Sequence, residues 1–306
     1  MDQASPLFTT RLAHLTAALQ TLPDKPEETA ESALQALWHL AAGQPLSVDV
    51  AALTPLPDLN DDQHGALDRW IEQRVSGTPL AHLTGRQQFM GLELLAGPQA
   101  LIPRRETELL AQGAVAKLHQ LADAQAPQTV VAMDVCTGSG NLALALAHGE
   151  PRARVFAADL SEDAVALAQR NVDHLGLQER VQVRAGDLLA PFDTPEFHAQ
   201  VDLLVCNPPY ISSGKVETMP TEIMAFEPRL AFDGGPFGIR ILQRLMREAP
   251  RYLRPGGWLA FEVGLGQGPA VLQWLQKAGH FDPAECVLDA QGQARAILAR
   301  RKEETL

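Results

Sequence analysis

The sequence predicts an α/β protein in which a small helical bundle precedes a mostly parallel, twisted sheet with helices on both faces. From about residue 100 onward, short apolar runs that suit strands alternate with alanine- and leucine-rich runs that suit helices. Before about residue 76, apolar side chains recur at helical spacing and β-branched runs are absent. With 306 residues, the chain is long enough for two domains.

The chain is expected to have three parts: a helical domain at 1–76, a linker at 77–100 and an α/β domain at 101–306. In the first part, Leu34, Leu37 and Trp38 follow the spacing of a helix. In the linker, glycines interrupt any helix, and the apolar run 89–95 reads as a strand, so we expect a small hairpin there.

Strands and helices of the α/β domain can be placed from the apolar runs and one capping residue. Ser161 suits a helix N-cap, and two acidic residues follow it in the first turn. The expected strands are 130–135, 155–158, 181–184, 201–205 and 258–263, and the expected helices include 142–148 and 162–174.

Composition excludes several classes of protein. The formal net charge of −12 argues against a surface that coats nucleic acid, because binding phosphates requires a basic face. The apolar runs are shorter than a membrane span requires, and the N-terminus does not read as a secretory signal. The three cysteines are far apart and form no CxxC pair, so we expect no disulfide framework and no metal site. A cytoplasmic location is the simplest expectation.

A glycine-rich turn follows the strand at 130–135, where an open α/β sheet binds ligands. Its glycines allow close approach of a ligand to the backbone, and Asp159, which ends the next strand, could accept hydrogen bonds from a ribose. A tight turn without a ligand is the alternative. The candidate binding residues of the turn are Cys136, Thr137, Gly138, Ser139 and Gly140.

The turn favours a nucleoside without a pyrophosphate. It lacks the complete GxGxxG motif and the lysine of a phosphate-binding loop, so S-adenosylmethionine suits it better than a dinucleotide. Asp187 follows the third strand at the same edge of the sheet and could accept from an adenine amino group. A helix cap or a loop charge is the alternative for Asp187.

An Asn-Pro-Pro-Tyr tetrapeptide, formed by Asn207, Pro208, Pro209 and Tyr210, follows the fourth strand. The prolines fix two φ angles and present carbonyl oxygens in a set geometry. The side-chain oxygen of Asn207 and the carbonyl of Pro208 could together accept both hydrogens of an NH2 group, and the ring of Tyr210 could stack on a planar substrate. A rigid strand-exit turn is the alternative.

These features favour transfer of a methyl group to a planar nitrogen. The lone pair of an amide or aniline-like nitrogen is delocalised, so the nitrogen is a poor nucleophile. A sulfonium methyl donor is a strong electrophile. Positioning and two acceptors for the NH2 hydrogens could therefore supply most of the catalysis.

The chain resembles the HemK family of protein-glutamine N5-methyltransferases, most closely the branch that modifies peptide chain release factors. The resemblance extends from about Thr29 to Arg301. Its matching segments are 77–85, 102–108, 136–140, 207–210 and 226–235. For Glu262 and Gln267, which also match, no role can be assigned from the sequence. Arg104 and Glu106 could line the cofactor pocket or pin the linker.

The resemblance implies a class I, Rossmann-like methyltransferase domain behind a helical domain that helps to dock a protein substrate. It implies S-adenosylmethionine contacts from the turn at 136–140, from Asp159, from Asp187 or Leu188, and from Asn207. It further implies that residues 207–210 hold a glutamine side chain, which in the release-factor branch belongs to a Gly-Gly-Gln motif. Asn207, Pro208 and Tyr210 are then the catalytic residues.

Two departures from the family pattern leave alternatives open. Cys136 stands where the turn usually opens with glycine, as expected of a branch that methylates a large-subunit ribosomal protein. Leu188 stands where some members have an aromatic residue beside the adenine. The segments 81–85, 102–108 and 289–295 favour the release-factor branch. Methylation of adenine N6 in nucleic acid, and cofactor binding without catalysis, are the remaining hypotheses.

Overall fold

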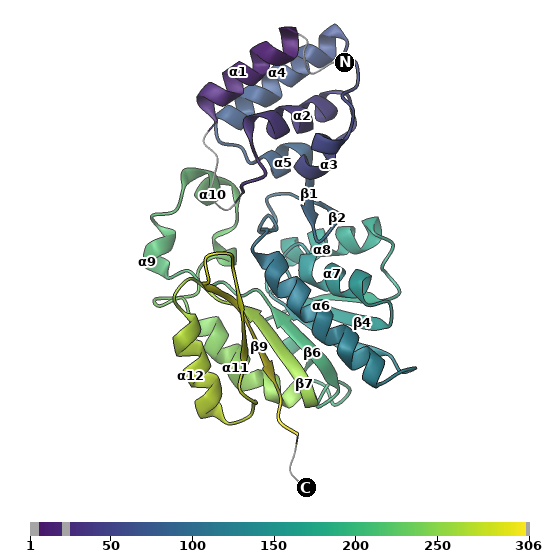
Figure 1. The fold of residues 1–306 in the computed structure, drawn as a ribbon, viewed down its shortest axis with the longest axis vertical. Coiled ribbons are helices and arrows are strands. Elements are labelled where there is room, and N and C mark those ends of the chain that lie inside the picture. Colours follow the sequence, from purple (N-terminus) through teal and green to yellow (C-terminus); the bar gives the residue numbers. More distant parts are fainter. Residues whose placement is uncertain (1–5, 20–24, 304–306) are drawn as a thin grey trace. The chain divides into compact units, whose positions relative to one another are not determined.

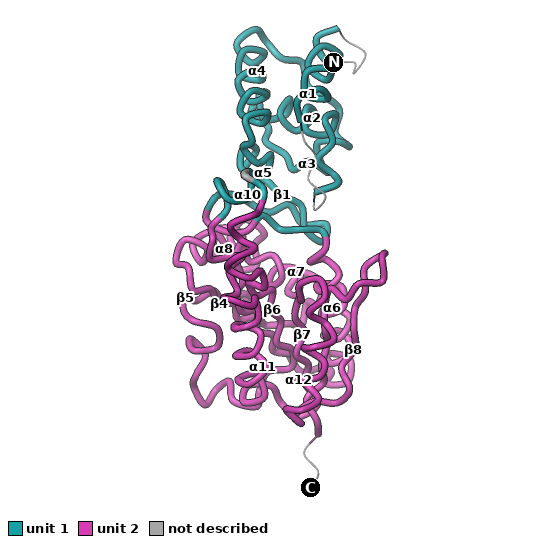
Figure 2. The backbone as a smooth tube through the Cα atoms, turned by 90° about the vertical axis from the view of Figure 1, so that its left-hand side faces the viewer, with its two compact units in different colours: residues 1–98, 102–105, 220–227 teal, residues 99–101, 106–219, 228–306 magenta. Residues whose placement is uncertain are grey.

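A computed structural model describes residues 6–19 and 25–303, and the chain divides into two compact units (Figures 1 and 2). Unit 1 contains residues 1–98, 102–105 and 220–227, and unit 2 contains residues 99–101, 106–219 and 228–306. The chain therefore returns to unit 1 twice after residue 98, and the second return begins ten residues after Tyr210.

Unit 1 is built from short helices around an apolar core. Trp38 is fully buried in that core, and its indole nitrogen donates to the carbonyl of Pro57 at 2.9 Å. Thr29 and Asn60 cap the two main helices with side-chain oxygens, as their sequence positions favour. The helices are α1 (Pro6–Ala18), α2 (Ala30–Ala41), α3 (Val48–Leu53), α4 (Asp61–Val75), α5 (Leu80–Thr84) and α10 (Thr221–Phe226).

An antiparallel hairpin of β1 (Arg86–Phe89) and β2 (Leu92–Leu95) ends the first pass through unit 1. The expectation of one strand over 89–95 is wrong, because Met90 and Gly91 form a two-residue turn in which both φ angles are positive, 51° and 79°. Such turns match the twist of the paired strands.

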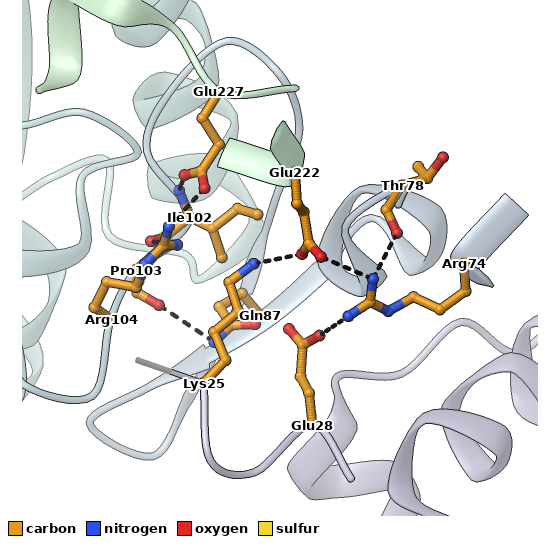
Figure 3. Close-up of polar contacts among 10 residues, drawn as sticks. All are labelled: Lys25, Glu28, Arg74, Thr78, Gln87, Ile102, Pro103, Arg104, Glu222 and Glu227. Atoms are coloured by element: carbon orange, nitrogen blue, oxygen red, sulfur yellow. Dashed lines mark hydrogen bonds and ion pairs between the residues drawn. The ribbon is translucent and has the colours of Figure 1, made fainter. Parts of the chain in front are cut away.

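The last segment of unit 1, residues 220–227, is held by charged groups that are largely buried (Figure 3). Glu222 accepts from Lys25 and from Arg74, each at 3.1 Å, and Arg74 also contacts Glu28 at 3.0 Å. Glu227 binds the guanidinium of Arg104 at 2.5 Å. The guanidinium of Arg74 thus lies between two carboxylates, one of which comes from the returning segment.

Unit 2 contains a seven-stranded sheet in the order β5-β4-β3-β6-β7-β9-β8. The first five strands of this order pair in parallel, and β9 pairs antiparallel with both β7 and β8. The strands are β3 (Val130–Val135), β4 (Ala153–Asp159), β5 (Val181–Ala185), β6 (Val201–Cys206), β7 (Leu253–Glu262), β8 (Glu285–Leu288) and β9 (Ala294–Arg300). The predicted α/β class with a mostly parallel sheet is confirmed.

Helices cover both faces of this sheet (Figure 1). On β9, Leu298 faces Gly113 of α6, whereas its neighbour Ile297 belongs to the core that packs under α11 and α12. This alternation places α6 and α12 on opposite faces. The helices are α6 (Thr107–Ala124), α7 (Asn141–Gly149), α8 (Glu162–His174), α9 (Ser213–Val216), α11 (Arg240–Tyr252) and α12 (Gly268–Ala278), with short 3₁₀ turns at Ala190–Phe192 and Arg229–Ala231.

In the described part of the chain, every helix is too short or too polar to span a bilayer. The same residues contain no group of three or more histidine, cysteine or acidic side chains arranged to hold a metal ion.

The ion pairs around Arg74 predict a large loss of stability when this residue is replaced. Arg74→Met keeps an apolar stem of similar length but leaves Glu28 and Glu222 without their guanidinium. Breaking a buried pair by removing one partner costs about 3–5 kcal/mol, and the free energy of unfolding from denaturant titration of the full chain should fall by that order.

Arg69→Met is the matched control, because Arg69 lies on the same helix and is exposed. Its effect should stay within about 0.5 kcal/mol. Equal effects of the two substitutions would contradict the structural role of the ion pairs.

Candidate active site

Three strands bring the predicted site residues to one edge of the sheet. Val135 at the end of β3 pairs with Ala158 of β4 on one side and with Cys206 of β6 on the other. The turn 136–140, Asp159 and Asn207 follow directly after these positions. Parallel strands thus place residues that are far apart in sequence at a common carboxyl end, where α/β sheets bind ligands.

The glycine-rich turn has a left-handed backbone at alternate positions. The φ angles are 61° at Cys136, 56° at Gly138 and 86° at Gly140. Only glycine adopts this conformation without a steric cost, so the structure gives a physical reason for a glycine at the first position of related turns. Cys136 pays that conformational cost, which is of the order of 1–3 kcal/mol.

Asp134, the penultimate residue of β3, accepts hydrogen bonds from the turn and from the helix that follows it. Its Oδ2 accepts from the hydroxyl of Thr137 at 2.5 Å and from the backbone N–H of Ala143 at 3.0 Å. The side chain is fully buried, and this burial raises the pKa of Asp134 to about 7 although both hydrogen bonds lower it. Asp134 is thus a structural acid beneath the turn.

Asp159 fixes the turn from the neighbouring strand. One carboxylate oxygen accepts from the N–H of Gly138 and the other from the N–H of Ser161, each at 2.9 Å. Burial raises the pKa of Asp159, and the backbone hydrogen bonds oppose that rise. A carboxylate has about four acceptor positions, and the backbone groups around Asp159 do not use all of them, so a ligand hydroxyl can still be accepted.

Asp187 and Leu188 follow β5 at the same edge. The Asp187 carboxylate forms an ion pair with Arg244 of α11 at 2.5 Å, a partner that the sequence did not suggest. Leu188 is buried and has a positive φ of 50°. The contact of either residue with an adenine stays a prediction.

Asn207 and Pro208 present two unused acceptors. The Asn207 side-chain nitrogen donates to Thr107 at 3.3 Å, whereas no described residue donates to its Oδ1. The Pro208 carbonyl likewise receives no hydrogen bond from the described residues. Two adjacent acceptors without donors suit the two hydrogens of a primary amide or an aromatic amine.

Glu262, at the end of β7, organises the side chains around the tetrapeptide. Its Oε2 accepts from the Thr107 hydroxyl at 2.6 Å and its Oε1 accepts from the Tyr210 hydroxyl at 2.8 Å. Burial raises the pKa of Glu262 to about 7. Burial and the facing Glu262 also hold the pKa of the Tyr210 phenol well above its usual range, so Tyr210 stays a donor.

Gln267, for which no role followed from the sequence, holds the backbone of the tetrapeptide through its side-chain amide. Its side-chain nitrogen donates to the carbonyls of Tyr210 at 3.1 Å and of Gly238 at 3.2 Å, and its oxygen accepts from Gly264 at 2.9 Å. Glycines permit this close packing, since a Cβ on Gly238 would lie 2.2 Å from the Tyr210 carbonyl oxygen.

Arg104 and Glu106, for which the sequence left two roles open, both make structural ion pairs. Arg104 binds Glu227 within unit 1, and Glu106 binds Arg295 of β9 at 2.6 Å within unit 2. Glu106 immediately precedes Thr107, so its ion pair helps to fix the start of α6 near Glu262.

Comparison with known proteins identifies the class of protein that this site belongs to. Residues 110–235 match the family model "Methyltransferase small domain". Among solved structures, the human methyltransferase 10 domain containing protein is 20% identical, with a TM-score of 0.51 over 69% of this chain and 88% of that chain. The human Mettl16 catalytic domain is 15% identical, with a TM-score of 0.54 over 71% of this chain and 77% of that one. The fold is that of a methyltransferase.

Sequence relatives define the family more narrowly. A release factor glutamine methyltransferase of Moorella thermoacetica is 41% identical over 76% of this chain and 79% of that protein. One of Geobacter sulfurreducens is 36% identical over 81% and 83%, and one of Koribacter versatilis is 32% identical over 96% and 97%. The chain belongs to the release factor glutamine methyltransferase family.

The packing around Tyr210 predicts that Gly238→Ala disturbs the site. The added Cβ would meet the Tyr210 carbonyl, and the positive φ of 68° disfavours alanine. A displacement of about 1 Å costs up to about 100-fold in rate, so we expect methyl transfer to fall about 10- to 100-fold in a steady-state assay.

Gly214→Ala provides the control, because Gly214 is exposed in α9 and a Cβ there meets nothing within 4 Å. This variant should keep the wild-type rate. Unchanged kinetics in Gly238→Ala would show that the close approach to Tyr210 does not position the site.

Proposed function

We propose that this protein transfers a methyl group from S-adenosylmethionine to the side-chain amide nitrogen, N5, of a glutamine in a peptide chain release factor. The observation that carries the proposal is the pair of unused acceptors, Asn207 Oδ1 and the Pro208 carbonyl, next to the half-buried ring of Tyr210. Membership in the release factor glutamine methyltransferase family supports glutamine as the substrate and the Gly-Gly-Gln motif as its setting.

The residues at the sheet edge suit S-adenosylmethionine. Asp159 has acceptor positions left for ribose hydroxyls, and Gly138 has no side chain that would keep a ligand from the backbone. The donor would lie against residues 136–140, with Leu188 as an apolar contact for the adenine. When bound, it supplies an electrophilic methyl group on a positively charged sulfur.

The acceptors of the tetrapeptide prepare the nitrogen for that methyl group. Asn207 Oδ1 and the Pro208 carbonyl each accept one amide hydrogen, which fixes the plane of the amide and increases the electron density on nitrogen. Pro208 and Pro209 restrict the backbone that carries these acceptors. The ring of Tyr210 packs against the planar amide. We therefore attribute the rate of methyl transfer to the positioning of the amide nitrogen and not to a strong catalytic base.

The helical part at 1–76 is proposed to help dock the release factor, as the family resemblance implies, and the cytoplasm is the proposed location. A nucleic-acid substrate is not expected, since the net charge of −12 disfavours phosphate binding.

Substrate identity is tested by incubating the protein with labelled S-adenosylmethionine and a release factor, a large-subunit ribosomal protein or DNA. Label should enter the release factor alone and should be lost when the glutamine of its Gly-Gly-Gln motif is replaced by glutamate. Label in the ribosomal protein alone, or in DNA alone, would overturn the assignment.

Asn207→Ala tests the acceptor role. Loss of one positioned polar partner at a reacting group costs about 100- to 1000-fold in kcat, and we expect a loss of that size. Calorimetry should still detect binding of S-adenosylmethionine. Turnover at the wild-type rate would refute the role of Asn207.

Asp159→Ala tests the ribose contact. Hydrogen bonds to a charged group contribute about 1.5–3 kcal/mol, so the Kd for S-adenosylmethionine should rise about 10- to 100-fold. The nearby exposed Asp163→Ala, in the first turn of α8, is the control and should leave the Kd unchanged. An unchanged Kd in Asp159→Ala would exclude the contact.

A further inference from the structure

The side chain of Asn207 has two orientations that differ in chemistry. An amide has an acceptor end and a donor end of nearly the same shape, and a rotation of about 180° exchanges them. Only the orientation that turns Oδ1 toward the substrate provides an acceptor for an amide hydrogen. The contacts that fix this orientation therefore determine whether Asn207 can accept a hydrogen from the substrate amide.

Thr107 is the residue that faces the other end of the Asn207 amide. A threonine hydroxyl has one hydrogen, and here that hydrogen is directed to Glu262 Oε2 at 2.6 Å. Thr107 can then only accept toward Asn207. The group that faces it at 3.3 Å must be the NH2 group, so Oδ1 points the other way.

Glu262 sets the direction of this chain of hydrogen bonds. An ionised carboxylate has no hydrogen to donate, so both hydroxyls that contact it, those of Thr107 and Tyr210, must donate. The hydrogen bonds therefore run one way, from Asn207 through Thr107 to Glu262. Contacts within such buried networks reinforce one another.

We propose that Glu262 is a positioning residue which, through Thr107, holds the Asn207 side chain with its oxygen toward the substrate nitrogen and, through the phenol, fixes the ring of Tyr210. The proposal rests on the function proposed above for Asn207. Glu262 does not touch the substrate, because its side chain is buried beneath Thr107 and Tyr210.

Glu262→Gln reverses the chain with almost no change in shape. An NH2 group that replaces Oε2 donates to Thr107, whose hydroxyl is then free to donate to Asn207, and the amide of Asn207 turns its NH2 group to the substrate. If the NH2 group replaces Oε1 instead, it donates to the phenol oxygen of Tyr210, and Tyr210 can no longer donate to residue 262. The first arrangement turns the Asn207 amide, and the second removes the bond that fixes the ring of Tyr210.

The expected result for Glu262→Gln is a fall in kcat of about 30- to 100-fold, smaller than the loss expected when the Asn207 acceptor itself is removed. The KM for the release factor and the Kd for S-adenosylmethionine should stay within about threefold of the wild-type values, because the surfaces that bind them are unchanged. Glu285→Gln, at an exposed position on β8, is the control for the same substitution and should keep the wild-type kcat.

Thr107 supplies a second route to the same test. Thr107→Val removes the hydroxyl that joins Asn207 to Glu262, with little change in volume, and should lower kcat about 10-fold or more. Thr107→Ser keeps the hydroxyl, so its kcat should lie within about threefold of the wild-type value. Because both residues act through one chain, the double variant Thr107→Val with Glu262→Gln should be no slower than the slower single variant.

The pH profile separates positioning from simple packing. The pKa of Glu262 is raised to about 7, chiefly by burial and in smaller part by Glu106, although the hydroxyls of Thr107 and Tyr210 and the charge of Arg295 lower it. Protonation adds a hydrogen to the acceptor, so wild-type kcat should fall as the pH decreases through about 7. Glu262→Gln should lose the part of this dependence that Glu262 contributes, since its amide does not titrate, whereas Asp134, whose pKa is also raised to about 7, is present in both proteins.

Activity of the wild-type protein tests the proposed function, and the kinetics of the variants test the role of Glu262. If the wild-type protein fails to methylate the release factor, the proposed function fails. If the wild-type protein is active, the inference about Glu262 is overturned by a wild-type kcat in Glu262→Gln, by multiplicative losses in the double variant, by failure of Thr107→Ser to restore kcat, or by identical pH profiles. Melting temperature and the Kd for S-adenosylmethionine establish that each variant is folded.

Discussion

The two hydrogen bonds that Glu262 accepts join the elements on which the site depends. Thr107 begins α6, Tyr210 follows β6, and Glu262 ends β7, so one carboxylate connects a helix, a loop and a strand. A buried carboxylate is costly unless donors face it. Here the donors are Thr107, which contacts Asn207, and Tyr210, which belongs to the tetrapeptide. The hydrogen bonds that stabilise the buried carboxylate therefore also fix the side chains that would act on the substrate nitrogen.

Acidic residues play a different part at the neighbouring strand ends. Asp134 and Asp159 bind backbone N–H groups of the glycine-rich turn and the helix starts beside it, so they shape a surface from backbone atoms. The site thus has two halves: a backbone cradle suited to a nucleoside, and a pair of acceptors suited to an amide. Parallel strands bring both halves to one edge because β3, β4 and β6 are adjacent.

The sequence predicted the parts that depend on local pattern. The strand at 130–135 has the predicted bounds, and Ser161 caps α8 because its hydroxyl is one turn from a free backbone N–H. The run 89–95 belongs to the hairpin expected in the linker but is not one strand, since its apolar residues span the hairpin turn. The antiparallel pairing of β8 and β9 was not predicted, because β8 is largely exposed and lacks a regular apolar alternation. The Thr107–Glu262 contact joins residues 155 positions apart, which no local pattern reveals.

The most direct test is a crystal structure of the protein with S-adenosylhomocysteine and a Gly-Gly-Gln peptide. We expect the glutamine side-chain nitrogen to lie within about 3 Å of both Asn207 Oδ1 and the Pro208 carbonyl oxygen, with the Thr107–Glu262 contact intact. A glutamine whose side-chain oxygen faces Asn207, or whose side chain lies away from residues 207–210, would contradict it.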